Sequence, residues 1–218
     1  TSISTNSNLI VRFSENVDAV TGNITLYKTT GDVLVEAFDV TTDIAGTGTT
    51  TITCNPAADL ESETDYYVKI DAAAFDDPSD NSFAGIADNT TWNFTSADET
   101  APTISSVSLA SDNSTIAVTM SEAVYTTTDA SSALVVGDFS LSISGGTATL
   151  SSATPSSIDI SGNVYTLGID LSATPLPNGS ETLTVNPLTA TAIYDAAGNA
   201  AAASQSNNTA TLNDETAP

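Results

Sequence analysis

Short runs in which apolar and polar residues alternate recur along the chain, and they predict β-strands. Residues 23–28 (Asn-Ile-Thr-Leu-Tyr-Lys) show the two-residue period of a half-buried strand. No segment sustains the 3.6-residue period of a helix, and only two alanine runs, 72–74 and 200–203, could form a helical turn. Short Thr-, Val- and Ile-rich strands between Gly-, Asn-, Asp-, Ser- and Pro-rich turns are typical of a β-sandwich. We therefore expect an all-β fold, with strands at residues 9–13, 23–28, 32–40, 49–54, 66–70, 90–95, 104–109, 115–120, 139–144, 147–151, 164–169, 182–185 and 209–212.

An internal repeat divides these predicted strands into two sets. The pentad Asp-Glu-Thr-Ala-Pro occurs at residues 98–102 and again at 214–218, one immunoglobulin-sized domain later. Self-similarity at a fixed period is the signature of tandem domains. Residues 6–17 also correspond to 113–124, and residues 75–81 to 193–199. We predict one domain at 1–98, with a truncated first strand, and a second at 99–218, ending in the next linker. Because the first copy lacks an opening pentad, we expect the chain to be cut from a longer array, with neighbouring repeats of the same chain as its partners.

The repeated motifs resemble those of a known family. Each copy has a strand that ends in Phe-Ser-Glu or Met-Ser-Glu, a late Asp-rich loop and the closing pentad. This frame resembles the bacterial Ig-like domains that repeat in S-layer proteins and giant surface adhesins. The resemblance covers both copies and implies two tandem Ig-like antiparallel β-sandwiches. It also implies a non-catalytic, often calcium-bound, extracellular repeat of a bacterial cell-surface or secreted protein. The first copy departs from the pattern, since it has Asp80 where the second has Gly198.

The chain is strongly acidic, with a formal net charge of −24 from 27 acidic and three basic residues. The three bases, Arg12, Lys28 and Lys69, all lie in the first copy. Such a chain repels nucleic acid and anionic membranes, so we expect neither as a partner. No signal peptide or transmembrane run is present, and we expect no direct membrane insertion. The acidic surface requires counter-cations, which is consistent either with solubility in a salty medium or with specific divalent binding.

Topology predicts where the acids of the second copy converge. Because strand directions alternate in an antiparallel sandwich, the linker before the first strand, the end of the second strand and the loop after the sixth should meet at one pole. Calcium takes six to eight oxygen ligands, whereas magnesium demands a stricter octahedron and fits less well. Each acid alone could be a solvated loop charge or a turn residue. The predicted calcium ligands are Asp98, Glu99, Glu122, Asp195 and Asn199, with a matching first-copy set of Glu15, Asp77, Asp80 and Asn81 that lacks linker ligands.

Catalysis has little support in the sequence. There is no histidine, and Cys54 is the only cysteine, so neither a Cys/His nucleophile nor a zinc site can be assembled. A carboxylate pair of the glycosidase type remains conceivable, but acids are too common here for their proximity to mean anything. We expect no enzyme.

The leading hypothesis is a calcium-rigidified extender, whose parent protein could bind a carbohydrate or surface ligand through other domains. The alternative is a carbohydrate- or surface-binding module of an adhesin or secreted enzyme, which would need exposed aromatic rings. Core packing is the expected role of Trp92, and we expect one of Tyr66 and Tyr67 to point inward and the other outward. Thr-rich runs at 46–53 and 147–154 could form a flat surface-binding face, although Thr is also simply a good strand residue.

Overall fold

The computed structural model describes residues 2–217. The chain divides into two compact units, residues 1–99 and 100–218, each built around its own hydrophobic core. Strands dominate both units, which confirms the predicted all-β fold, and the helical residues within 2–217 are two short 3₁₀ turns, η1 (Thr30–Asp32) and η2 (Val136–Asp138). The alanine runs at 72–74 and 200–203 form no helix.

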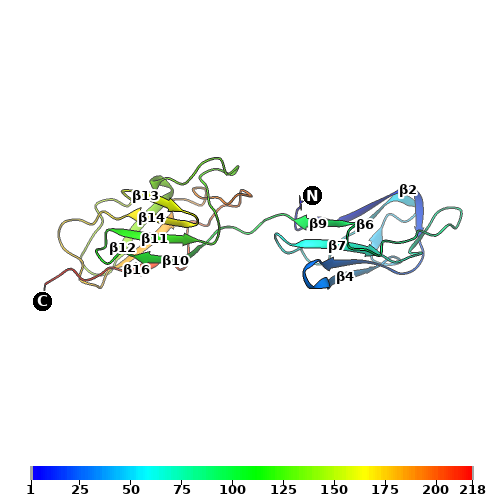
Figure 1. The fold of residues 1–218 in the computed structure, drawn as a ribbon, viewed down its shortest axis with the longest axis horizontal. Coiled ribbons are helices and arrows are strands. Elements are labelled where there is room, and N and C mark those ends of the chain that lie inside the picture. The colour runs from blue at the N-terminus through cyan, green and yellow to red at the C-terminus, as the bar shows by residue number, and fades with distance from the viewer. Residues whose placement is uncertain (1, 218) are drawn as a thin grey trace. The chain divides into compact units, whose positions relative to one another are not determined.

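The first unit is a sandwich of two sheets (Figure 1). One sheet has five strands in the order β1-β9-β7-β3-β4, and the other has four in the order β5-β6-β2-β8. Pairing is antiparallel except between β1 and β9, which run parallel. The strands are β1 (Ser2–Ile3), β2 (Leu9–Ala19), β3 (Asn23–Lys28), β4 (Val33–Asp39), β5 (Ile44–Ala45), β6 (Thr49–Cys54), β7 (Asp65–Ile70), β8 (Phe75–Asp76) and β9 (Asn93–Ser96).

Alternation along the strands explains the core of this unit. Ile24 and Leu26 of β3 are fully buried between the sheets, and Ile52 of β6 meets them from the other layer. The intervening residues of β3 are only partly covered. Burying one apolar side chain of this size stabilises the fold by about 1.5–3 kcal/mol, so the two-residue pattern selects which face of each strand turns inward.

The second unit pairs its strands in the orders β10-β11-β14-β13 and β12-β15-β16, all antiparallel. Its core includes the fully buried side chains of Ile116, Phe139, Leu167 and Leu183. The strands are β10 (Ile104–Leu109), β11 (Thr115–Met120), β12 (Phe139–Ser144), β13 (Ile158–Ser161), β14 (Val164–Gly168), β15 (Thr182–Pro187) and β16 (Thr209–Thr211).

Two predictions about the second unit are wrong at the level of single strands. The segment 147–151 is not a strand, and only Leu150 makes an isolated bridge, to Leu171. The backbone N–H groups of Thr147 and Ala148 instead donate to the buried carboxylate of Glu181, which removes them from any ladder. Conversely, β13 lies outside the predicted strands; it is a four-residue edge strand with mostly exposed side chains, although Ile158 and Ile160 alternate with polar residues.

Two differences concern the first unit. Strand β2 extends to Ala19, well beyond the predicted end at Phe13, because a register shift between Arg12 and Val17 lets it continue and pair with β8. The two-residue strands β5 and β8 are too short to produce a detectable sequence period.

Candidate metal centre

A loop after β15 holds the buried carboxylate of Asp195 in a fixed position. Its Oδ1 accepts hydrogen bonds from the backbone N–H groups of Ala197 (2.9 Å) and Asn199 (2.8 Å), and its Oδ2 accepts one from Nδ2 of Asn199 (2.8 Å). Gly198 has φ +92°, a left-handed conformation that the tight turn requires and that glycine adopts at little cost. Asp195 therefore shapes its own loop and is fully buried while doing so.

The second acid of this centre is Glu122, which follows β11. The structure brings Glu122 and Asp195 together, with carboxylate oxygens within 4.8 Å of one another. No Lys or Arg occurs in the second unit, so no basic side chain of this unit offsets their charge. Two ionised carboxylates at this distance repel each other, and a bound cation would convert the repulsion into attraction.

The linker acids Asp98 and Glu99 make contacts within the first unit. Oδ1 of Asp98 accepts a hydrogen bond from Oγ of Ser62 (3.1 Å). Oε1 of Glu99 accepts from Oγ of Ser4 (2.6 Å) and from the backbone N–H of Thr5 (3.2 Å), and its Oε2 accepts from the Thr5 hydroxyl. These hydrogen bonds, the one from Ser4 first, lower the pKa of Glu99. Glu99 is thus held by the domain that it closes, and its role as a metal ligand stays a prediction.

The second copy of the pentad behaves in the same way. Oε1 of Glu215 accepts a hydrogen bond from Nδ2 of Asn113 (2.9 Å), and the Glu215 N–H donates to the Pro177 carbonyl (2.9 Å). Glu99 and Glu215 each fold back onto the unit in which they lie. The repeated pentad predicts a contact of its glutamate with the next domain, whereas the structure shows contacts with the unit that precedes it.

The first unit repeats the Asp195 loop closely. Oδ1 of Asp77 accepts from the backbone N–H groups of Ser79 and Asn81, and its Oδ2 from Nδ2 of Asn81, each at 2.8 Å. Asp80 takes the left-handed conformation (φ +62°) that Gly198 takes in the second unit. The correspondence of residues 75–81 with 193–199 therefore extends to individual hydrogen bonds.

The predicted first-unit ligands are only partly brought together. Glu15, Asp77 and Asn81 line one hollow of about 220 Å³, whereas the exposed Asp80 is not part of its lining. Among residues 2–217, no group of three carboxylates within 4.8 Å of one another lies entirely in the first unit.

One further acid was missed by sequence analysis. Asp76 directly precedes this loop, and its Oδ1 is buried with no hydrogen-bond partner among the described residues. It pairs across the ladder with Asp18, so two carboxyl groups share this edge of the sheet. The doubled acid at residues 76–77 is the sequence signal that points to this group.

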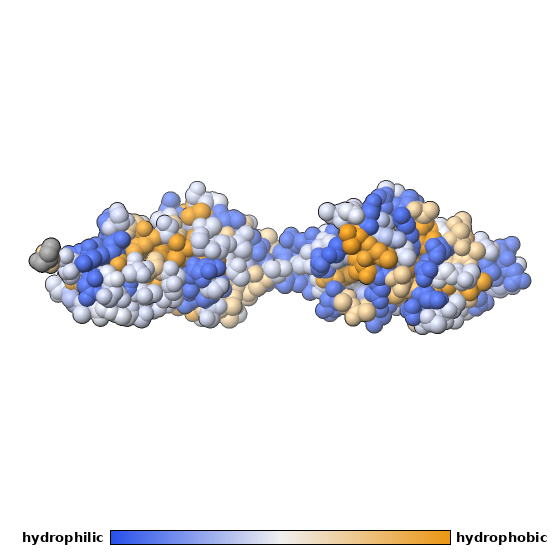
Figure 2. Space-filling model, turned by 90° about the horizontal axis from the view of Figure 1, so that it is seen from below, coloured by the Kyte–Doolittle hydropathy of each residue, from blue (hydrophilic) through white to orange (hydrophobic). Residues whose placement is uncertain are grey.

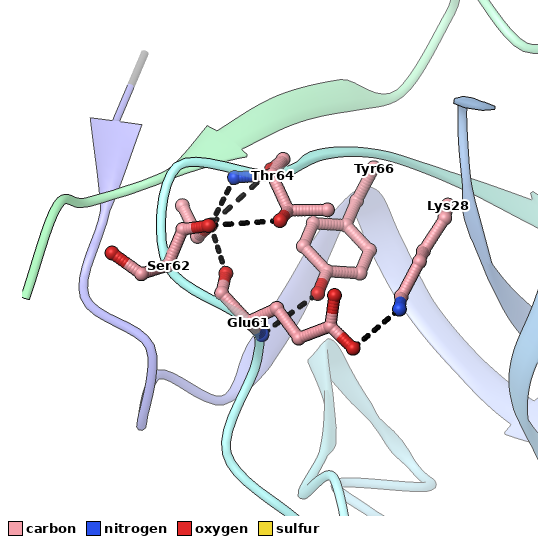
Figure 3. Close-up of polar contacts among 6 residues, drawn as sticks. Lys28, Glu61, Ser62, Thr64 and Tyr66 are labelled. Atoms are coloured by element: carbon pink, nitrogen blue, oxygen red, sulfur yellow. Dashed lines mark hydrogen bonds and ion pairs between the residues drawn. The ribbon is translucent and has the colours of Figure 1, made fainter. Parts of the chain in front are cut away.

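A tyrosine corner fixes the loop that receives the linker (Figure 3). The hydroxyl of Tyr66 accepts a hydrogen bond from the backbone N–H of Glu61 (2.9 Å), the arrangement that many Ig-like sandwiches use. Oγ of Ser96 accepts from the Thr64 N–H (2.9 Å) and donates to the Glu61 carbonyl (2.5 Å). The Glu61 side chain forms an ion pair with Lys28 (2.5 Å). Within this loop, the Ser62 hydroxyl contacts the linker.

Both adjacent tyrosines are nearly inaccessible, although alternation puts them on opposite faces of β7. Tyr66 stacks on Phe94 in the core, with ring centroids 5.5 Å apart. Tyr67 stacks on Tyr27 at 5.0 Å, and Nζ of Lys69 lies 5.4 Å from both ring centroids. One of the two tyrosines was expected to face outward, but Tyr67, on the face opposite to the core, is only 2% exposed because these neighbours cover it.

Cys54 and Trp92 are the remaining candidate residues. Burial, and secondarily the charge of Glu36, raises the pKa of the Cys54 thiol to about 12, so the thiol is protonated at neutral pH and is a poor nucleophile. Trp92 is half-buried against the core, in keeping with the packing role expected for it.

The family comparison agrees with the sequence motifs of the first copy. Residues 1–96 match the family model of the bacterial Ig-like domain. No curated protein matches the chain. Among solved structures, a biofilm associated protein (BSP domain) is 15% identical with a TM-score of 0.25, covering 100% of this chain, which spans 29% of that one. A chimeric titin Z1Z2 functionalized with a KLER exogenous peptide from decorin is 14% identical with a TM-score of 0.20, covering 86% of this chain and 84% of that one.

Within the described residues, no helix has the length and apolar character needed to cross a membrane.

The match of residues 1–96 spans nearly all of the first unit, and the repeated motifs carry the same frame into the second. The predicted resemblance to bacterial Ig-like domains is therefore confirmed for residues 1–96.

Proposed function

We propose that the chain is a non-catalytic tandem Ig-like repeat of a large bacterial cell-surface or secreted protein, and that calcium stiffens it as an extender. The family match to residues 1–96 supports the class of protein. The repeated pentad supports an array in which neighbouring repeats are the partners. The observation that carries the metal proposal is the pair of Glu122 and Asp195, two carboxylates within 4.8 Å in a unit that has no basic side chain.

Calcium suits these groups better than other common cations. It accepts carboxylate, amide and backbone oxygens in flexible geometry, and extracellular modules bind it with Kd on the order of 10⁻⁴–10⁻³ M. Glu122 and Asp195 would supply the charged ligands, and Asn199 would supply an amide or backbone oxygen. Asp98, which the repeat predicts as the linker ligand, would join the linker to the same ion and so restrict its motion.

Calcium binding can be measured directly by calorimetry and by thermal unfolding in calcium, in magnesium and in chelator at matched ionic strength. A ligand present at a hundredfold excess over its Kd stabilises the folded state by about 2.7 kcal/mol, so the unfolding temperature of the second unit should rise. Glu122→Gln should remove most of this rise. Asp159→Asn, which removes an exposed charge from β13 of the same unit, should keep it. Equal unfolding temperatures in calcium and chelator would refute the proposal.

The linker and first-unit ligands need separate tests. Asp98→Asn should weaken calcium binding if the linker takes part, and small-angle scattering of the wild type should then show a more uniform particle in calcium than in chelator. Scattering curves that coincide would refute stiffening even if calcium binds. For the first unit, Glu15→Gln made in a Glu122→Gln background should abolish any remaining calcium effect. An effect that persists would exclude Glu15 as a ligand.

The carbohydrate-binding alternative lacks the surface that it requires. Every Phe, Tyr and Trp side chain is buried or half-buried, and the exposed large apolar residues are all aliphatic. In the hollow beside Glu15, the ring of Phe13 packs against Phe75 and Phe83 with centroids 5.2 Å away in each case. These rings pack against one another, and stacking on a sugar would require a free ring face.

A further inference from the structure

Strand β4 of the first unit exposes three consecutive apolar side chains. Val33 and Leu34 are each 51% exposed and Val35 is 43% exposed. Strand β4 forms one edge of the five-stranded sheet, so no further strand of this unit covers it. Figure 2 shows hydrophobic surface gathered on the side of this unit where β4 lies in Figure 1. Single exposed apolar residues are ordinary, but a run of them on an edge strand is what proteins usually avoid.

These side chains border a groove of about 540 Å³ on the first unit. Its other wall is the segment after β6, with Ala57, Ala58 and Leu60, and Tyr66 lines it as well. The backbone of β4 is also oriented for pairing. Because the Val40 N–H donates to the Gly22 carbonyl (3.0 Å), strand alternation turns the peptide groups of Phe38 toward β3 and those of Ala37 outward.

The second unit has no regular strand in the position of β4, because its β12 pairs with β15 as β3 pairs with β7. There the outermost strand of the smaller sheet is β12, and the Leu141 N–H donates to the Ala153 carbonyl (2.7 Å). The irregular segment around Ala153 therefore occupies the position beside β12. A regular edge strand with an exposed apolar run at this place is therefore found in the first unit and not in the second.

The groove is rimmed by acids. Glu36, Asp59 and Glu61 line it, and the one base among its lining residues, Lys28, is already paired with Glu61. Asp32 and Asp39 stand at the two ends of β4. An occupant must therefore bring apolar side chains for the groove and positive charge for its rim.

We propose that the edge of β4 binds an extended polypeptide segment with alternating apolar and basic side chains, added to the sheet as a further strand. Strand addition uses main-chain hydrogen bonds for affinity and alternate side chains for specificity. Charge complementarity selects this occupant over a second copy of the chain, because a second copy would bring the same acids to the same edge.

The test titrates the full chain with a synthetic peptide of four Lys-Val repeats and, in parallel, with one of four Glu-Val repeats. Nuclear magnetic resonance should show shifts confined to β4, β3 and residues 57–61 for the basic peptide alone. Leu34→Lys places a positive charge in the groove and should weaken binding at least tenfold. Ile10→Lys is the matched control, since Ile10 is 50% exposed on β2 in the other sheet, and it should bind as the wild type does.

Three results would overturn the proposal. The first is absence of binding by the basic peptide. The second is equal weakening by Leu34→Lys and Ile10→Lys, which would show general attraction to an acidic protein. The third is self-association in analytical ultracentrifugation that Leu34→Lys alone abolishes, which would assign the edge to a second copy. Circular dichroism of both variants verifies that a loss of binding does not reflect unfolding.

Discussion

Replacing Tyr66 with Phe should destabilise the first unit without disturbing its core. The ring is 1% exposed and stacks on Phe94, and phenylalanine would preserve both features. What disappears is the acceptor for the Glu61 N–H at 2.9 Å, which leaves a partly buried donor unsatisfied. Leaving such a group without a partner costs about 1–3 kcal/mol. The exposed Lys28–Glu61 pair beside it contributes less than about 1 kcal/mol and cannot compensate.

Thermal and denaturant unfolding would measure this change. A loss of 1 kcal/mol lowers the unfolding temperature of a domain of this size by about 4–8 °C. Tyr165→Phe is the matched control in the second unit, because the Tyr165 hydroxyl makes longer contacts to Val124, at 3.3 and 3.4 Å, and its loss should cost less. The reasoning fails if Tyr66→Phe leaves the first transition unmoved, or if Tyr165→Phe proves the more damaging of the two.

Three further predictions concern Glu181, the glycine beside it and Cys54. Three backbone N–H groups, that of Ala148 foremost, lower the pKa of Glu181 from 4.5 to about 2. The stabilising effect of this carboxylate is therefore complete above pH 4.5 and is lost as the pH falls toward 2. Denaturation midpoints measured across this range should fall less steeply for Glu181→Gln than for the wild type. Gly146→Ala should lower the unfolding temperature of the second unit, since φ is +53° and the added Cβ would lie 2.1 Å from Oε1 of Glu181. Cys54 should resist a thiol reagent at about pH 8 until denaturant unfolds the first unit, and prompt modification of the native protein would contradict its burial.

Sequence reasoning found the central strands well, because their signal is local and periodic. The expected range 23–28 agrees with β3, and 115–120 agrees with β11. It failed where tertiary contacts decide the outcome. Residues 147–151 have strand-like composition, yet Glu181, more than thirty positions away, captures their N–H groups.

The candidate site shows the same division. Strand alternation was enough to predict that Glu122 and the Asp195 loop would lie together, and the structure places their carboxylates within 4.8 Å. The glutamate of the pentad could not be assigned in this way. The repeat does not say which domain the glutamate contacts, and hydrogen bonds from Ser4 and Thr5 hold Glu99 on the preceding domain.

The parallel pairing of β1 with β9 has a consequence under tension. Because the first strand and the last strand of this unit run side by side in the same direction, a force applied to its two ends would pull them past each other. The bonds joining Ser2 and Ile3 to Thr95 and Ser96 would then be loaded together in shear, with the Ala97 N–H to Ile3 carbonyl bond (2.6 Å) beside them. The hydrogen bond from the Thr5 N–H to Glu99 adds to these contacts near the end of the domain. Shear loads these bonds together, whereas a terminal antiparallel pair would open one bond at a time, so we expect this short patch to raise the force at which the domain yields.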